Sequence, residues 1–227
     1  MQPFPLPLLA CTPIADRHTL LRLDPRDTPF REAHVAPGQV ALLGFQPEAT
    51  FPMAIASVPG DEVVEVLMAS KTESDQQALL SREGPLYCGG PKGPGFPLAR
   101  ARGRSLWLFA GGSAISGLRA VIETLLRERD AYGEVRLLYG AKTDDLVCFR
   151  DSFARWQAAG IEVQVALSRH SDPGAAKRYV QELLPAELDG AGEMLAFVCG
   201  RPAMEQAVTE ALLARGVDAG AICKNWP

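Results

Sequence analysis

The sequence predicts a two-part protein, with an antiparallel β-barrel over residues 1–103 and an α/β domain built on a parallel sheet over residues 104–227. In the first part, Pro and Gly punctuate short runs of alternating apolar residues, which is typical of antiparallel strands. In the second part, unbroken apolar runs are each followed by apolar residues at helical spacing. The length of 227 residues is sufficient for two small domains.

The first part contains three clear strand patterns. They cover residues 40–45, 53–57 and 63–68, and turn residues bound each of them. A short helix is expected over residues 74–81. Many short strands separated by turns are typical of a barrel or a sandwich.

The second part alternates strands with helices. Strands are expected over residues 106–110, 135–139, 161–167 and 194–198. The helical patterns that follow them cover residues 118–125, 149–156, 175–184 and 203–215. Four strands that alternate with four helices predict a parallel sheet covered on both faces.

The composition excludes several classes of function. The net charge is −4 and there is no basic run, so nucleic acid is not an expected partner. No apolar stretch approaches the ~20 residues that span a membrane, and prolines interrupt the apolar N-terminus, which argues against a signal peptide. The five cysteines and three histidines lack the spacing of a metal site. We expect a reduced, cytoplasmic protein with no bound metal and no membrane partner.

Ligands of an open parallel sheet bind beyond the carboxyl ends of its strands. Four loops should meet there, over residues 111–117, 140–142, 168–170 and 199–202. In the first loop, GGSAISG, Ser113 and Ser116 can cap the next helix, and free N–H groups beside the helix dipole suit a pyrophosphate. Alone, this loop fits a plain βα turn equally well, since it is neither GxGxxG nor Walker A. The convergence of all four loops predicts a pyridine-nucleotide site.

One residue pair and one single residue in these loops leave alternatives open. Ser168 and Arg169 either hold the 2′-phosphate of NADPH or lie solvated in a loop. Cys199 is either a small buried apolar residue or has a role against the nicotinamide ring.

Six motifs occur in order along the chain. They are PGQ (37–39), FPMAIAS (51–57), GPKGPGFPL (90–98), AGGSAISGLR (110–119), LYG (138–140) and CGRPAM (199–204). Together they resemble the ferredoxin–NADP reductase superfamily, and most closely its short bacterial members related to the electron-transfer subunits of dihydroorotate dehydrogenase and sulfhydrogenase. The resemblance implies a flavin-binding barrel, an NAD(P)-binding domain, and hydride transfer between nicotinamide and flavin.

The strand-exit loops and the resemblance together predict cofactor contacts. Those to a flavin, FAD or FMN, are Phe51, Pro52, Met53, Ala54, Ile55, Ala56, Ser57, Gly93, Gly95 and Phe96. Those to NADPH or NADH, bound as a substrate, are Gly111, Gly112, Ser113, Ala114, Ile115, Ser116, Tyr139, Gly140, Lys142, Ser168, Arg169, Gly200, Arg201 and Met204. Cys199 and Trp226 are the candidates for direct roles at the reacting rings. Trp226 either covers a ring or fills a surface groove.

The flavin motif departs from the family pattern. Phe51 stands where the family has an arginine on the flavin phosphate, and Met53 and Ala54 replace a tyrosine and a serine. Glu73 and Asp75 lie where the family has a phosphate loop, and they would repel a pyrophosphate unless they point away. A lost charge-assisted contact costs ~1.5–3 kcal/mol. Either a flavin is retained through backbone amides around residues 55–57 and apolar contacts, or the flavin site is lost and the barrel serves a partner.

Other departures bear less on the nucleotide site. Ala114 and Gly117 replace a glycine and a proline of the first loop, and neither change removes a backbone donor. The cysteines of a [2Fe–2S] cluster are missing, since only Cys223 lies in that region. An internal iron–sulfur relay is therefore not expected.

These observations predict an enzyme, an NAD(P)H-dependent flavin oxidoreductase. It would pass hydride from nicotinamide to flavin and electrons on to free flavin, ferric iron or a redox protein. The alternative is a non-catalytic nucleotide-binding subunit with a degenerate flavin site, which docks on a partner enzyme.

Overall fold

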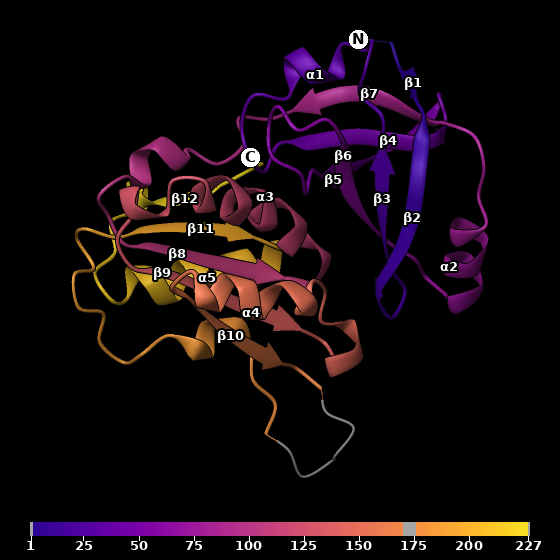
Figure 1. Ribbon diagram of the computed structural model, residues 1–227. Helices are drawn as coiled ribbons and strands as arrows, with labels where there is room; N and C mark the ends of the chain where they lie inside the picture. The colour runs from indigo at the N-terminus through magenta and orange to yellow at the C-terminus, as the bar shows by residue number, and fades with distance from the viewer. Residues whose placement is uncertain (1, 170–175, 227) are drawn as a thin grey trace.

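The computed structural model describes residues 2–169 and 176–226 and confirms the predicted class of fold. Figure 1 shows antiparallel strands, coloured indigo to magenta, at the upper right, and a parallel sheet, coloured magenta to yellow, at the lower left. Within the described ranges, no helix is both long and apolar enough to cross a membrane.

The first half contains two antiparallel sheets. One has the order β1 (Phe4–Leu6), β7 (Leu86–Lys92), β4 (Val40–Gln46), β5 (Ala49–Ala54), and the other has the order β2 (Leu8–Ala15), β3 (His18–Leu23), β6 (Val64–Ala69). Two helices accompany them, α1 (Phe30–Ala33) and α2 (Glu73–Leu80). β5 ends at Ala54, earlier than the strand expected over 53–57, because Ile55 already forms a bridge with Val66 of the other sheet.

The second half is a five-stranded parallel sheet. Its order is β10 (Ile161–Leu167), β9 (Val135–Ala141), β8 (Leu106–Gly111), β11 (Leu195–Cys199), β12 (Ile222–Lys224). Its α-helices are α3 (Ile115–Leu126), α4 (Arg150–Ala158) and α5 (Pro202–Leu213). Short 3-10 turns occupy Leu98–Ala101, Gly112–Ala114, Arg129–Ala131, Asp144–Leu146, Val180–Leu183 and Ala219–Ala221. The sequence patterns missed β12, which is too short to show a periodicity.

The helix expected over residues 175–184 is wrong. Residue 175 lies outside the described ranges, and the rest forms an irregular segment followed by the single turn Val180–Leu183. The backbone N–H of Arg178 donates to the carbonyl of Leu167 at the end of β10, which holds this segment beside the strand. Pro185 disfavours a helical conformation at Leu184, and Leu184 is indeed extended.

The larger hydrophobic core crosses from one half to the other. It fills the space around the parallel sheet and includes Leu20, Ala56 and Leu67 from the first half. The ring of Phe96, from the first half, stacks on Phe197 of β11, with centroids 4.8 Å apart and planes 15° apart. The two halves are therefore packed by apolar contact as well as by polar contacts.

His34, at the end of α1, is buried in the first half. Its ring lies edge-on to Phe30, and Nε2 has no hydrogen-bond partner within residues 2–169 and 176–226. Burial lowers the pKa of His34 to about 4, from an ordinary value of 6.5. The folded protein thus keeps this ring neutral at a pH where the unfolded chain protonates it.

Stability should consequently fall as the pH decreases from about 6.5 toward 4, because the unfolded state binds the extra proton. Between pH 7.5 and 5, protonation of His34 in the unfolded state lowers the free energy of unfolding by about 2 kcal/mol. Urea unfolding measured across this pH range should show that the wild type loses free energy of unfolding as the pH falls. In His34→Gln this loss should be smaller by about 2 kcal/mol. The matched control is His18→Gln, at a less buried position. Equal pH dependence in His34→Gln and the wild type would contradict the prediction.

Candidate functional site

The loops that follow β8, β9, β10 and β11 surround one cavity of about 1080 Å³. Most of the residues proposed to contact the pyridine nucleotide line it: Gly111, Gly112, Ser113, Ala114, Gly140, Lys142, Ser168, Arg169, Gly200, Arg201 and Met204. Ile115, Ser116 and Tyr139 are buried behind this wall. The hydroxyl of Tyr139 accepts from the backbone N–H of Cys148, so this side chain positions the start of α4.

The cavity is strongly cationic, although the chain as a whole is acidic. Six cationic side chains line it: Arg17, Lys142, Arg169, Lys177, Arg178 and Arg201. None of the described lining residues is Asp or Glu. Such a concentration of one sign of charge in a concave site attracts anions, and the phosphates of a nucleotide carry the matching charge.

The sequence patterns missed two groups of cavity residues. The helical pattern includes Lys177, Arg178 and Tyr179, and it gives no sign that they lie beside the cavity. Arg17 and His18 belong to the other half of the chain, at the turn between β2 and β3. No local signal in the sequence links a hairpin turn to loops more than ninety residues away.

The start of α3 differs from the expectation that Ser113 and Ser116 cap it. Within the described residues, no side chain caps this helix or the 3-10 turn before it. The hydroxyl of Ser116 instead donates to the carbonyl of Ser113. Gly112 has φ +57°, and a Cβ built on it would meet nothing within 4 Å. An uncapped helix start beside open space fits the phosphates of a dinucleotide.

Two residues of the predicted flavin set, Ala54 and Gly93, lie where the first half meets the second. Gly117 of α3 closely approaches β5, since a Cβ on it would be 3.4 Å from that of Ala54. A Cβ on Gly93 would lie 3.0 Å from the Trp226 ring, so the tryptophan packs on the first half. Trp226 remains 43% exposed.

Other members of the predicted flavin set have structural roles. Phe96 is buried in the interface, and Gly95 has φ +66° with the carbonyl of Pro37 only 2.7 Å from a would-be Cβ. The backbone N–H groups of Ile55 and Ala56 donate to the carbonyls of Gln39 and Glu65. These two amides are therefore not open to a flavin. Pro52, Met53 and Ser57 complete the set, on β5 and just after it.

The residues present do not fit a flavin phosphate in the position that the family uses. Phe51 is 63% exposed and offers no charge. At the start of α2, the hydroxyl of Thr72 accepts from the N–H of Asp75, and the Asp75 carboxylate accepts from the N–H of Thr72. This reciprocal cap places a carboxylate at the helix N-terminus, where an incoming phosphate would meet like charge.

Cys199 lies at the end of β11 and is buried. Its thiol donates to Oδ1 of Asn225, whose side-chain amide in turn donates to the carbonyl of Gly38 in the first half. Burial, with a smaller contribution from Glu205, raises the pKa of Cys199 to about 12. The group is therefore a protonated thiol at neutral pH, which bridges the halves through Asn225.

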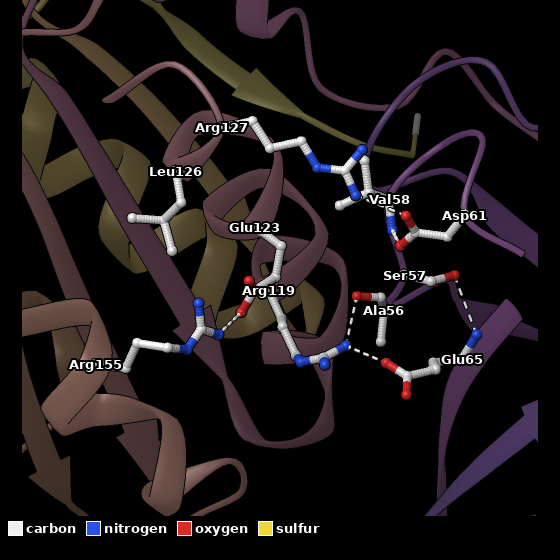
Figure 2. A pocket seen from close by; sticks show the side chains of 10 residues that line it. All are labelled: Ala56, Ser57, Val58, Asp61, Glu65, Arg119, Glu123, Leu126, Arg127 and Arg155. Atoms are coloured by element: carbon white, nitrogen blue, oxygen red, sulfur yellow. Dashed lines mark hydrogen bonds and ion pairs between the residues drawn. The ribbon is translucent and has the colours of Figure 1, made fainter. Parts of the chain in front are cut away.

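A second, smaller pocket of about 300 Å³ lies where α3 meets the first half (Figure 2). Arg119 donates to the carbonyl of Ala56 and to Glu65, at 2.8 and 2.7 Å. Arg127 pairs with Asp61 at 2.6 Å, again across the two halves. The third arginine, Arg155, pairs with Glu123. Three arginines face three carboxylates, so these charges balance and serve packing rather than an anionic ligand.

Comparison with known proteins agrees with this geometry. Residues 108–210 match the family described as the oxidoreductase NAD-binding domain. The chain is 26% identical over 201 residues to the sulfhydrogenase 2 subunit gamma of Pyrococcus furiosus, covering 82% of this chain and 69% of that protein. It is 36% identical over 114 residues to the nitrate reductase [NAD(P)H] of Hordeum vulgare, covering 44% of this chain and 13% of that protein.

A solved ferredoxin NADP+ reductase from Neisseria gonorrhoeae, with bound FAD and NADP, superposes with a TM-score of 0.80 at 15% identity. The match covers 99% of this chain and 98% of that one. Residues 108–210 are therefore similar to an oxidoreductase NAD-binding domain, in a chain that has the ferredoxin–NADP reductase-like fold. The predicted resemblance to that superfamily is confirmed.

A substitution in the wall of the cavity tests whether the nucleotide binds there. Ser113→Glu places a carboxylate on its wall beside the start of α3, where it would repel phosphates. The Kd for NADPH and NADH should rise at least about tenfold, which corresponds to about 1.4 kcal/mol. Fluorescence titration measures this. Ala154→Glu, an equal charge change at an exposed position of α4, should leave the Kd unchanged. An unaltered Kd in Ser113→Glu would mean that the nucleotide binds elsewhere.

Proposed function

We propose that this protein is an NAD(P)H-dependent flavin oxidoreductase, with residues 1–103 and 104–227 as its two domains. The observation that carries the proposal is the cationic cavity at the carboxyl edge of the parallel sheet, which gathers the loops proposed to bind a nucleotide. When bound, a pyridine nucleotide donates hydride and a flavin accepts it. The residues of the chain bind and orient these groups.

Four features of the chain support this role. The uncapped start of α3 and the cationic lining hold phosphates. Asn225 and Arg119 fix the second half against the first, which keeps the orientation of two bound rings constant. The buried thiol of Cys199 keeps its proton and leaves this part of the interface uncharged. Electrons would pass to an acceptor such as free flavin, ferric iron or a redox protein.

We further propose that the flavin, FMN or FAD, is exchangeable and not tightly held. Phe51 supplies no charge to a phosphate, and the cap of α2 opposes one. A missing charge-assisted contact weakens binding by about tenfold or more. Loose binding would make the flavin a second substrate, which the protein reduces and releases.

The experiment that tests this is NAD(P)H oxidation by desalted protein, with and without added FMN or FAD. We expect at least an about tenfold rise in rate with flavin, saturating with its concentration, because the desalted protein has lost it. Absorption near ~450 nm before and after desalting reports how much flavin remains. A rate that does not respond to flavin would contradict the proposal.

The preference for NADPH rests on Ser168 and Arg169, both of which line the cavity. Arg169→Ala should raise the KM for NADPH by about tenfold or more and that for NADH by less than about twofold, since only NADPH carries the 2′-phosphate. Arg169→Lys keeps the charge and should recover most of the NADPH affinity. Steady-state kinetics with both nucleotides measure this difference. Equal effects on the two would remove the assignment.

A second candidate function is a nucleotide-binding subunit that docks on a partner enzyme. The exposed Phe51 and the capped start of α2 favour it, because they leave the position of a family flavin without its phosphate contacts. The similarity to a sulfhydrogenase gamma subunit is consistent with it. Such a protein would bind NAD(P)H in titration and yet show no oxidation of it with any added flavin.

A further inference from the structure

Arg17 belongs to the first half of the chain but lines the cavity formed by the loops of the second half. It lies at the turn between β2 and β3, which Figure 1 shows beside α2. The turn contacts the second half directly, because the backbone N–H of Asp16 donates to the carbonyl of Asp145 at 2.9 Å. Arg17 thus lines the cavity together with Ser70 and His18, which also belong to the first half.

The backbone of Arg17 is in a conformation that few residues other than glycine adopt, with φ +53°. Two contacts maintain it. Its N–H donates to Oε1 of Gln76, and its carbonyl accepts from the N–H of Ser70 at 2.7 Å. Strain of this kind costs of order 1–3 kcal/mol and persists only where the surroundings impose it.

Gln76 makes this turn rigid. The side chain is buried on α2, and its amide also donates to the carbonyls of Ala15 and His18 and to the hydroxyl of Thr19. The turn is therefore fixed before any ligand binds. A guanidinium on a rigid support binds an anion with little loss of entropy on ordering.

The guanidinium itself is placed to bind an anion. Nε donates to the Asp16 carboxylate at 2.9 Å, which is the one side-chain contact of this guanidinium among the described residues, and the side chain is 36% exposed. The planar N–H groups of arginine match the geometry of a phosphate. The other cations around the cavity, and the lack of carboxylates among its described lining residues, make a phosphate the fitting ligand.

We infer that Arg17, which reaches the cavity from the first half of the chain, binds a phosphate group of a nucleotide cofactor, and so supplies a positive charge that Phe51 cannot. The inference rests on the proposed function. The expected ligand group is a nucleotide phosphate. It belongs either to a flavin nucleotide (FMN or FAD) or to NAD(P)H. The charge comes from a hairpin turn instead of from the strand β5.

Binding titrations of Arg17→Gln with FMN, riboflavin, NADPH and NADH test the inference. Gln is neutral and similar in length, so the Kd for the phosphate-bearing ligand should rise by about tenfold or more. Arg17→Lys should retain most of the affinity. The control is Arg22→Gln, which removes the same charge from an exposed position on the same hairpin outside the cavity lining. Thermal unfolding checks that each variant is folded.

The ligands distinguish the two sources of phosphate. If Arg17 contacts the flavin, the variant weakens FMN and leaves riboflavin, which has no phosphate, unchanged. If it contacts the pyridine nucleotide, NADPH and NADH weaken and both flavins do not. Raised salt should lower the affinity of the wild type more than that of Arg17→Gln, because it screens the charge.

Three results would count against the inference. Affinities of Arg17→Gln within about twofold of the wild type for every ligand overturn it. Equal losses of affinity in Arg22→Gln also overturn the inference, since the effect then comes from the net charge of the protein and not from position 17. Wild-type protein that binds no flavin and no NAD(P)H refutes the proposed function, and the inference with it.

Discussion

The packing of α3 against the first half is the constraint on which the rest of the site depends. Arg119, in the middle of this helix, bonds the carbonyl of Ala56 and the carboxylate of Glu65 in a largely buried position. The ion pair adds little net stability after its desolvation is counted, but it fixes geometry. Because α3 begins at the first nucleotide loop, the same helix sets where that loop lies relative to the β2–β3 turn.

The sequence predicted the elements whose signal is local. The apolar runs of β8, β9, β10 and β11, and the glycines that follow three of them, were sufficient to locate the nucleotide loops. It failed where the decisive contact is distant. The segment after β10 has a helical pattern, but its residue Arg178 bonds to Leu167 of β10, and residues 176–179 are irregular. Arg17 enters the cavity through a turn whose partners, Ser70 and Gln76, are more than fifty residues away.

Residues 51–57 keep the sequence pattern of a flavin motif, although the side chain that would contact a flavin phosphate is missing. The N–H of Ala56 donates to Glu65 of the other sheet, and the N–H of Ile55 donates to Gln39, just before β4 of its own sheet. Positions 38 and 95 have positive φ, and Phe96 and Pro37 leave no room there for a side chain, so both positions require glycine. These residues specify the interface between the halves. Preserved sequence in this region therefore indicates preserved packing, and it says less about a bound flavin.

At Arg17, the left-handed backbone lowers the stability of the fold, while the side chain supplies a positive charge to the cavity. Glycine is the residue best suited to φ +53°, and it would relieve of order 1 kcal/mol of strain. A laboratory selection for heat resistance alone would therefore tend to replace this arginine with glycine. The resulting protein would be harder to melt and would have one cation fewer facing the cavity. Consensus or thermostability engineering of this fold should therefore treat position 17 as a site to hold fixed.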